Sequence, residues 1–304
     1  MSQNQLWSAI NISEGRRLDA LERLARSIVE SGASLADWSA DPDHNRSVFS
    51  LVGDQARLLA GLRLIFAWAL EEIDLTLHRG QHPRLGAVDV VPFAPLGGSD
   101  LEMARQAARF CAQAVADEFN VPIFLYRDSS NPAGPPVTLP LLRRGGLAHL
   151  TERLLAQEIR QDFGPPAPHR TLGVAVFGAR SPLVAYNCIL NTTDLEIGKS
   201  IAAKVRASNG GPAGLQALAF PLQARDGAIQ VSMNLTEPEK TPPHVAFLKV
   251  NEVAAEFGTE VVSSELIGLV PQQALREAFR HFLKLDALRP NQVAENNLFQ
   301  GENH

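Results

Sequence analysis

Cysteine is scarce in this chain, and its scarcity excludes two classes of protein. The 304 residues contain only Cys111 and Cys188. Two cysteines this far apart match no zinc-binding spacing, and a small disulfide-stapled domain needs more of them. Cys111 falls on the alanine-rich face of a predicted helix and Cys188 in an apolar strand. We therefore expect both to be reduced, buried side chains that pack as small hydrophobes.

Long apolar runs are also missing. No stretch approaches the roughly 20 apolar residues that a membrane-spanning helix requires. The first residues, Met1-Ser-Gln-Asn-Gln, have neither the basic segment nor the apolar core of a signal peptide. Hydrophobic residues make up 45% of the chain and charged residues 20%, the balance of a globular protein that buries a core. The sequence thus predicts a cytoplasmic protein with no membrane partner.

Dense positive charge is absent too. The formal net charge is −5, and Lys and Arg form no long run. Because clustered cations facing phosphates dominate binding to nucleic acids, we expect no nucleic acid partner. Small anionic ligands are not excluded, because a few arginines can make a cleft positive on an acidic protein.

Helix and strand patterns alternate along the chain in two similar series. In the first half, apolar residues at helical or alternating spacing predict strands at 6–11, 34–40, 47–52, 87–93 and 121–126, and helices at 16–30, 54–75, 99–119 and 146–160. In the second, they predict strands at 171–177, 183–190, 215–222, 229–235 and 259–263, and helices that begin near 193, 241 and 271. Ser99-x-x-Glu102 and Thr193-x-x-Glu196 are typical of capping boxes, and Thr241 is the expected N-cap of its helix.

Each half therefore contains strand, helix, two strands, helix and strand. This order is typical of ferredoxin-like domains, whose antiparallel or mixed sheet carries helices on one face. The predicted fold class is α+β, with two tandem ferredoxin-like (split βαβ) subdomains. The Gly- and Pro-rich stretch 162–171 is the best boundary candidate, and we divide the chain into subdomains 1–178 and 179–304.

The most unusual stretch runs from His78 to Gly86 and reads HRGQHPRLG. Gly and Pro stop the preceding helix, so the two histidines and two arginines are held on a loop, where catalytic groups are often found. An ordinary charged connector is the alternative. His78 and His82 have the spacing of zinc ligands on a helix, but Gly80 and Pro83 break that helix, so we predict no metal.

Two further segments are candidates. Residues 37–46, DWSADPDHNR, have the composition of a hairpin turn, in which Arg46 could pair with a ligand carboxylate or with Asp37 or Asp43. Residues 164–173 have the composition of an interdomain linker. The sequence contains no GxGxxG after a strand, no P-loop lysine and no GxSxG elbow, so it indicates neither a nucleotide site nor a serine nucleophile.

The order of these motifs resembles the formiminotransferase domain of glutamate formiminotransferases. The resemblance runs from Asn11 to about Phe282 and does not extend to the cyclodeaminase domain of bifunctional family members. It rests on Asn11-Ile-Ser-Glu-Gly15, Asn45-Arg46, His82-Pro-Arg-x-Gly86-Ala-x-Asp89-x-x-Pro92-Phe93, Asp162-Phe-Gly-Pro165, Gly178-Ala-Arg180 and Leu266-x-Gly268-Leu-Val-Pro271.

The resemblance implies a site and its ligands. Folate is expected in a groove between the two subdomains, His82 as the catalytic histidine, and Arg84 beside it. The family is typically dimeric and needs no metal, so a homodimer is expected, with tetrahydrofolate as acceptor substrate. The implied substrate- and folate-binding residues are Asp41, Asn45, Arg46, Gly164, Pro165, Pro166, Ala167, Pro168, His169, Arg170, Thr171, Leu172 and Gly173.

The chain departs from the family pattern in two places. Ser39 stands where the family often has an acidic residue. If that carboxylate orients the histidine, either Asp41 or Asp37 takes its place here or the mechanism differs. Leu172 stands where an aromatic residue is sometimes found.

The implied reaction moves a formimidoyl group from N-formimino-L-glutamate to N5 of tetrahydrofolate. One nitrogen must lose a proton and the other must gain one, and histidine titrates in the right range for both. Arginine suits the two substrate carboxylates, with Arg84 and Arg46 the first candidates and Arg79 and Arg180 the next.

A polyglutamate tail could follow Arg143-Arg144 or the helix that carries Lys199, Lys204 and Arg206, although a solvated helix face is the simpler interpretation of the lysines. Formyl transfer at the same site and non-catalytic folate binding are the alternative functions.

Overall fold

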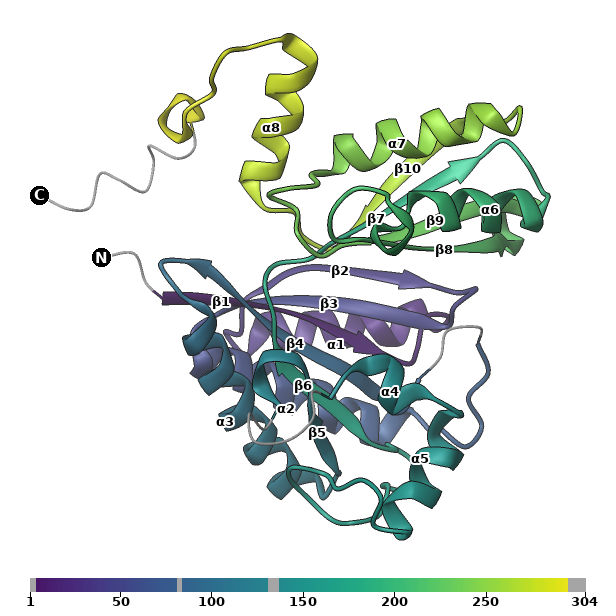
Figure 1. The fold of residues 1–304 in the computed structure, drawn as a ribbon. Coiled ribbons are helices and arrows are strands. Elements are labelled where there is room, and N and C mark those ends of the chain that lie inside the picture. Colours follow the sequence, from purple (N-terminus) through teal and green to yellow (C-terminus); the bar gives the residue numbers. More distant parts are fainter. Residues whose placement is uncertain (1–3, 81–83, 131–136, 295–304) are drawn as a thin grey trace, which may run out of the picture. The chain divides into compact units, whose positions relative to one another are not determined.

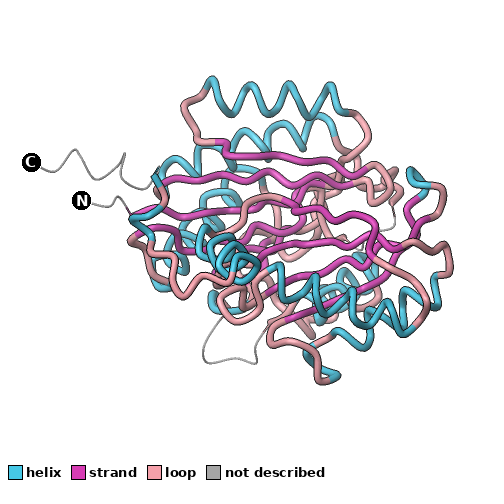
Figure 2. The backbone as a smooth tube through the Cα atoms, turned by 90° about the horizontal axis from the view of Figure 1, so that it is seen from above, coloured by secondary structure: helices cyan, strands magenta, loops and turns pink. Residues whose placement is uncertain are grey.

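The structure is a computed structural model that describes residues 4–80, 84–130 and 137–294. The chain divides into two compact units, residues 2–181 and residues 182–304, and each has its own sheet (Figure 1). The alternation of strands and helices in each unit can be followed along the backbone in Figure 2. Among the described residues, no helix combines the length and apolar character needed to cross a bilayer.

The first unit begins with a ferredoxin-like arrangement. Its strands are ordered β2-β3-β1-β4, and each neighbouring pair is antiparallel. Asp54 caps the second helix by accepting a hydrogen bond from the backbone N–H of Arg57. The elements are β1 (Asn4–Ile12), α1 (Leu18–Glu30), β2 (Leu35–Asp41), β3 (Arg46–Gly53), α2 (Gln55–Glu72) and β4 (Val88–Gly97).

Two parallel strands extend this sheet beyond β4. Strand β6 pairs with β4 and with β5, which gives the six-stranded order β2-β3-β1-β4-β6-β5. The added elements are α3 (Leu101–Phe119), β5 (Ile123–Leu125), α4 (Leu139–Arg143), α5 (Gly146–Leu155) and β6 (Ala175–Ala179).

The Gly- and Pro-rich stretch 162–171 is therefore not the boundary that its composition predicts. The strand that follows it, β6, lies inside the first sheet rather than opening the second unit. The backbone N–H groups of Asp162 and Phe163 donate to Ile123 O, and the Asp162 carboxylate accepts from Leu125 N–H. The stretch is thus hydrogen-bonded to β5 and belongs to the first unit.

The parallel strands are buried on both faces. Val91, Phe93 and Phe177 pack with α1, α2 and α3 in one apolar cluster. Val90 and Val176, one residue out of phase, pack with α4 and α5 in another. A strand covered on both sides reads as a continuous apolar run, as β6 does and as the first half of β4 does apart from Asp89.

The second unit repeats the ferredoxin-like arrangement. Its strands are ordered β10-β7-β9-β8, and every neighbouring pair is antiparallel. Two split βαβ sheets confirm the predicted fold class. The elements are β7 (Val184–Leu190), α6 (Leu195–Val205), β8 (Leu215–Leu222), β9 (Ala228–Leu235), α7 (Pro243–Glu256), β10 (Val261–Ile267) and α8 (Gln272–Leu283). Short 3-10 turns lie at Arg127–Ser129, Ala207–Asn209, Gln223–Arg225 and Pro290–Gln292.

Local chemistry follows the sequence with small shifts. Both cysteines are free and buried, and burial raises the pKa of each thiol to about 12, as expected of packing residues. Helix α3 is capped by Asp100 and α6 by Asp194, each one residue after the predicted Ser99 and Thr193. A carboxylate accepts the N-terminal N–H groups as well as a hydroxyl does, so the two possibilities compete at adjacent positions.

Candidate functional site

The connection between α2 and β4 is the best candidate for a functional site. It leaves the helix after Glu72 and enters the strand at Val88. Backbone hydrogen bonds fix both of its ends: Leu75 N–H donates to Thr171 O at 3.0 Å, and Ala87 N–H donates to Leu172 O at 2.9 Å. Val174 N–H donates to Leu85 O at 3.0 Å. Two segments singled out from the sequence, 78–86 and 164–173, therefore meet along the backbone.

Glycines make this contact possible. A Cβ on Gly86 would lie 1.9 Å from Val174 O, inside the carbonyl itself. Gly173 has a φ of +69°, and a Cβ there would lie 2.3 Å from Leu85 O. No larger residue fits either position without moving the backbone. Both glycines thus serve the frame of the site.

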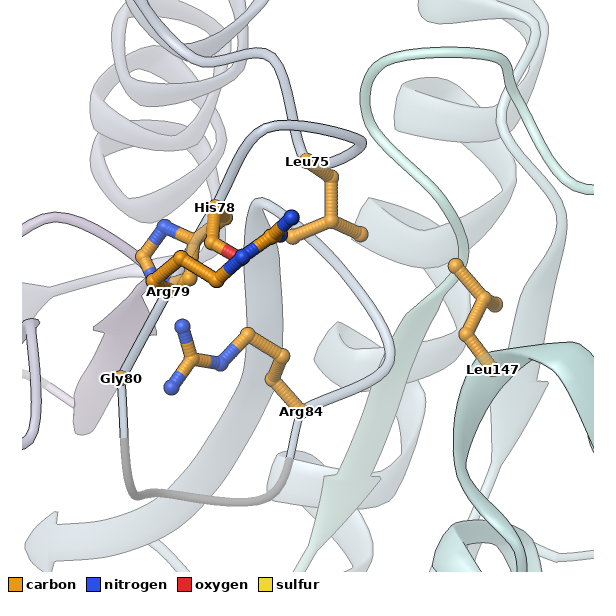
Figure 3. Close-up of a pocket in the computed structure, with 6 residues that line it drawn as sticks. All are labelled: Leu75, His78, Arg79, Gly80, Arg84 and Leu147. Atoms are coloured by element: carbon orange, nitrogen blue, oxygen red, sulfur yellow. The ribbon is translucent and has the colours of Figure 1, made fainter.

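A pocket of about 320 Å³ opens beside the connection (Figure 3). It is lined by Leu75, His78, Arg79, Gly80, Arg84 and Leu147. Figure 3 shows the Arg84 guanidinium directed toward Gly80, in agreement with the short approach of its Nη2 to that glycine. Gly80 and Arg84 flank residues 81–83, which lie outside the described residues, so the role predicted for His82 is not tested.

The β2–β3 turn supports the connection from the other side. The Asn45 side chain donates from Nδ2 to Arg79 O at 2.9 Å, and its Oδ1 accepts from Gly15 N–H at 3.0 Å. Arg84 Nη2 donates to His44 O at 3.3 Å. Asn45 has a φ of +48°, a region that Asn tolerates better than most residues. The predicted hairpin is confirmed, and its turn lies against residues on both sides of the 81–83 segment.

Both carboxylate oxygens of Asp41 contact His44 within the turn. Its Oδ1 accepts from the backbone N–H of His44 at 2.9 Å, and its Oδ2 lies 2.5 Å from His44 Nδ1. Burial raises the pKa of the Asp41 carboxyl, but the His44 hydrogen bonds and the charge of Arg46 outweigh it, so the pKa lies below its usual value. The carboxylate is therefore ionised and oriented toward His44.

Positive charge is concentrated around the turn and the pocket. Burial lowers the pKa of Arg46 and of Arg84, and repulsion from Arg143 lowers both further. Arginine remains charged despite such shifts. Arg46, Arg84 and Arg143 lie within electrostatic range of one another and of the Asp89 carboxylate. A ligand carboxylate would be attracted to this cluster of arginines.

A buried ion pair joins α4 to the same connection. Asp89 is only 3% exposed; its Oδ1 accepts from Leu85 N–H at 2.7 Å and its Oδ2 from Arg143 Nη2 at 2.5 Å. No local pattern in the sequence predicts this pair. The only signal was a lone carboxylate within the apolar strand pattern, and its partner lies 54 residues away.

The far end of the segment 164–173 is a tight loop built on His169. Its N–H and C=O exchange hydrogen bonds with Gly173, at 2.8 and 2.9 Å. Its Nδ1 accepts from Leu172 N–H at 3.1 Å, and burial with the charge of Arg170 lowers the pKa of the ring. An unprotonated Nδ1 is required for that bond. Leu172 is buried in the core, whereas Pro166, Ala167 and Arg170 are exposed.

Comparison with known proteins identifies the family of this chain. The pattern of the formiminotransferase domain, N-terminal subdomain, matches residues 6–180, and that of the formiminotransferase domain matches residues 185–298. The chain is 35% identical to the glutamate formimidoyltransferase of Thermoplasma acidophilum over 295 residues, which cover 96% of this chain and 97% of that protein. It belongs to the formiminotransferase family.

Other relatives agree with this membership. The glutamate formimidoyltransferase of Streptococcus pyogenes serotype M1 is 37% identical over 292 residues, 95% of this chain and 96% of that protein. The formimidoyltransferase-cyclodeaminase of Gallus gallus is 35% identical over 285 residues, which are 91% of this chain and 52% of that protein. The resemblance drawn from the motifs is thereby confirmed, and the chain is an enzyme of the transferase class.

Not all the predicted residues of this formiminotransferase gather at the pocket. Arg180 donates its N–H to Phe93 O, within β4 and eight residues along the chain from Leu85, and it is not among the residues that line the pocket. Lys199 and Lys204 form exposed ion pairs with Glu196 and Glu256, as the solvated-face interpretation predicts. Of the described residues, no group of three or more His, Cys, Asp or Glu side chains is placed to hold a metal ion.

Proposed function

We propose that this formiminotransferase moves the formimidoyl group from N-formimino-L-glutamate to N5 of tetrahydrofolate, giving 5-formiminotetrahydrofolate and L-glutamate. The observation that carries the proposal is the cluster of arginines at a pocket whose lining residues Gly80 and Arg84 flank residues 81–83. The glutamate part of the donor has two carboxylates, and arginine suits them because its planar guanidinium can form two parallel hydrogen bonds to a carboxylate.

His82 has the role of proton carrier in this proposal. N5 attacks the formimidoyl carbon, a C–N bond forms, and His82 takes the N5 proton. The bond from that carbon to the glutamate nitrogen then breaks, and His82 returns the proton to the departing nitrogen. Imidazole suits both steps because its unperturbed pKa, roughly 6.5, lies close to neutral pH. Its position in the sequence, between two residues that line the pocket, supports the role.

The arginines have separate roles. Arg84 lines the pocket and is the principal candidate for a donor carboxylate, because its guanidinium can form two parallel hydrogen bonds to one carboxylate. Arg46 adds positive potential from within the cluster, since it is more deeply buried. The exposed residues Pro166, Ala167 and Arg170 are the part of the segment 164–173 best placed to meet folate, while Leu172 acts in the core.

The test is a direct assay with purified chain. N-formimino-L-glutamate and tetrahydrofolate are mixed with the protein, and mass spectrometry follows 5-formiminotetrahydrofolate and free glutamate. We expect equal amounts of both products, with no requirement for added metal. N-formyl-L-glutamate serves as the second donor. Turnover of the formyl donor alone, or tetrahydrofolate binding without turnover of either donor, would contradict the proposal.

A further inference from the structure

The Asp41–His44 contact joins the two ends of the β2–β3 turn. The carboxylate accepts from both the main chain and the ring of His44, at 2.9 and 2.5 Å. The His44 side chain is only 7% exposed. Two hydrogen bonds between residues three apart fix both the course of the backbone and the orientation of the ring, and a charge-assisted bond is the stronger kind. The turn 41–46 is thus held as a rigid unit.

This rigid turn contacts the pocket connection at two places. His44 O accepts from Arg84 after the 81–83 segment, and the Asn45 side chain donates to Arg79 O before it. Gly80 packs tightly against the turn, because a Cβ on Gly80 would lie 2.5 Å from His44 O and 2.9 Å from Asn45 Cβ. A shift of the turn must therefore move Arg79, Gly80 or Arg84. All three line the pocket.

We infer that Asp41 and His44 form a positioning pair that sets Arg84 and the backbone of Arg79 and Gly80 for donor binding. This inference rests on the proposed function. Neither residue lines the pocket; the pair acts through the turn. Misplacing a substrate-binding group by about 1 Å can cost roughly 100-fold in rate, so a pair outside the pocket can have a large effect on the rate.

The chain offers a matched control for this pair. His149 and Glu152, on α5, are also three residues apart and also join a ring Nδ1 to a carboxylate oxygen, at 3.3 Å. Their side chains are 45% and 76% exposed, against 7% and 37% for His44 and Asp41. The two pairs share chemistry and spacing, but only one supports the pocket.

The experiment compares Asp41→Asn, His44→Gln and the double variant with His149→Gln. Thermal unfolding of each variant first verifies that it is folded. We expect kcat/KM for N-formimino-L-glutamate to fall roughly 10- to 100-fold in each single variant at the turn, mostly through a raised donor KM, with the KM for tetrahydrofolate nearly unchanged. The double variant should be no worse than either single one, because both remove the same contact. His149→Gln should match the wild type, and Asp41→Glu should recover part of the loss.

A second readout does not depend on turnover. Trypsin cleaves after Arg79 and Arg84, so the rate of cleavage there reports how firmly the turn holds the connection. We expect faster cleavage in His44→Gln than in His149→Gln at equal thermal stability.

Folded turn variants with wild-type donor kinetics and wild-type cleavage would overturn the inference. If the wild type itself fails to transfer a formimidoyl group, the proposed function fails, and the cleavage rates alone decide whether the pair positions the connection.

Discussion

Both units contain the βαββαβ arrangement, yet the connection from its second helix to its fourth strand differs between them. In the first unit, whose sheet has two further parallel strands, this segment runs from residue 73 to residue 87. In the second unit, the equivalent segment from α7 to β10 is residues 257–260. The long connection contributes Leu75, His78, Arg79, Gly80 and Arg84 to the pocket, whereas the short one has only four residues. One fold can thus carry a candidate site in one unit through what is inserted between the elements of the sheet.

The two units also differ in how deeply their ion pairs are buried. Asp89 and Arg143 of the first unit are buried and joined to the pocket connection. Lys204 and Glu256 of the second unit form an equally close pair, but about half of each side chain is exposed. Breaking a buried ion pair destabilises the fold more than breaking an exposed one, because the charge left in the interior cannot be hydrated.

The largest expected effect is on kcat, and it comes from a change in the long connection of the first unit. Replacing His82 by Asn in the long connection should lower kcat for formimidoyl transfer by about 10²–10⁴-fold, because the proton carrier is lost. Tetrahydrofolate binding, measured by calorimetry, should stay within about twofold of the wild type, since the change leaves the arginines in place. Retained turnover in the Asn variant would show that another group carries the proton.

The next effect concerns stability. Asp89→Asn leaves Arg143 without its carboxylate partner inside the first unit, and we expect the free energy of unfolding to fall by about 3 kcal/mol, the lower end for a broken buried pair because Arg143 keeps some exposure. Urea denaturation measures the change. An Asp89→Asn protein as stable as the wild type would mean that Asp89 and Arg143 contribute no more than a surface pair.

A third change separates binding from folding. Arg84→Ala should raise the KM for N-formimino-L-glutamate by roughly 10- to 100-fold, the effect of losing hydrogen bonds to a charged group, while the melting temperature stays near that of the wild type. Arg225→Ala, an exposed arginine in the β8–β9 turn of the second unit, is the control and should leave the KM and the melting temperature unchanged. An equal rise in both variants would indicate a general loss of structure instead.

The smallest effect completes the comparison. Glu256→Gln removes the exposed partner of Lys204 in the second unit. Because solvent and salt screen such pairs, urea midpoint and kcat/KM should both be indistinguishable from the wild type. A measurable loss of either would show that the second unit depends on its surface charges in a way that the first does not.

The sequence predicts the framework well, because both βαββαβ series follow from apolar periodicity. The boundary at 162–171 was wrong, since Gly and Pro mark irregular backbone whether or not it is hydrogen-bonded to a sheet. Helix α4 was missed because it is only five residues long, too short to show a helical apolar period. The Asp89–Arg143 pair depends on two residues brought together only by the fold, which no local pattern contains.

The site was predictable to the level of its segments. Residues 78–86, 37–46 and 164–173 were all singled out, and the structure brings the described parts of them together. Which contacts each residue makes within these segments was not predictable. Asp41 was considered as a partner that orients His82, and in the structure both of its carboxylate oxygens contact His44. Choosing among neighbouring polar residues requires distances, which composition does not supply.

The shielded backbone beside the pocket has a consequence for hydrogen exchange. Ala87 and Val174, whose amides tie the pocket connection to the segment beside it, are both fully shielded from solvent. Such amides exchange with deuterium only when a large part of a domain opens. We therefore expect these two amides to exchange far more slowly than the amide of the exposed Arg79, which lines the pocket.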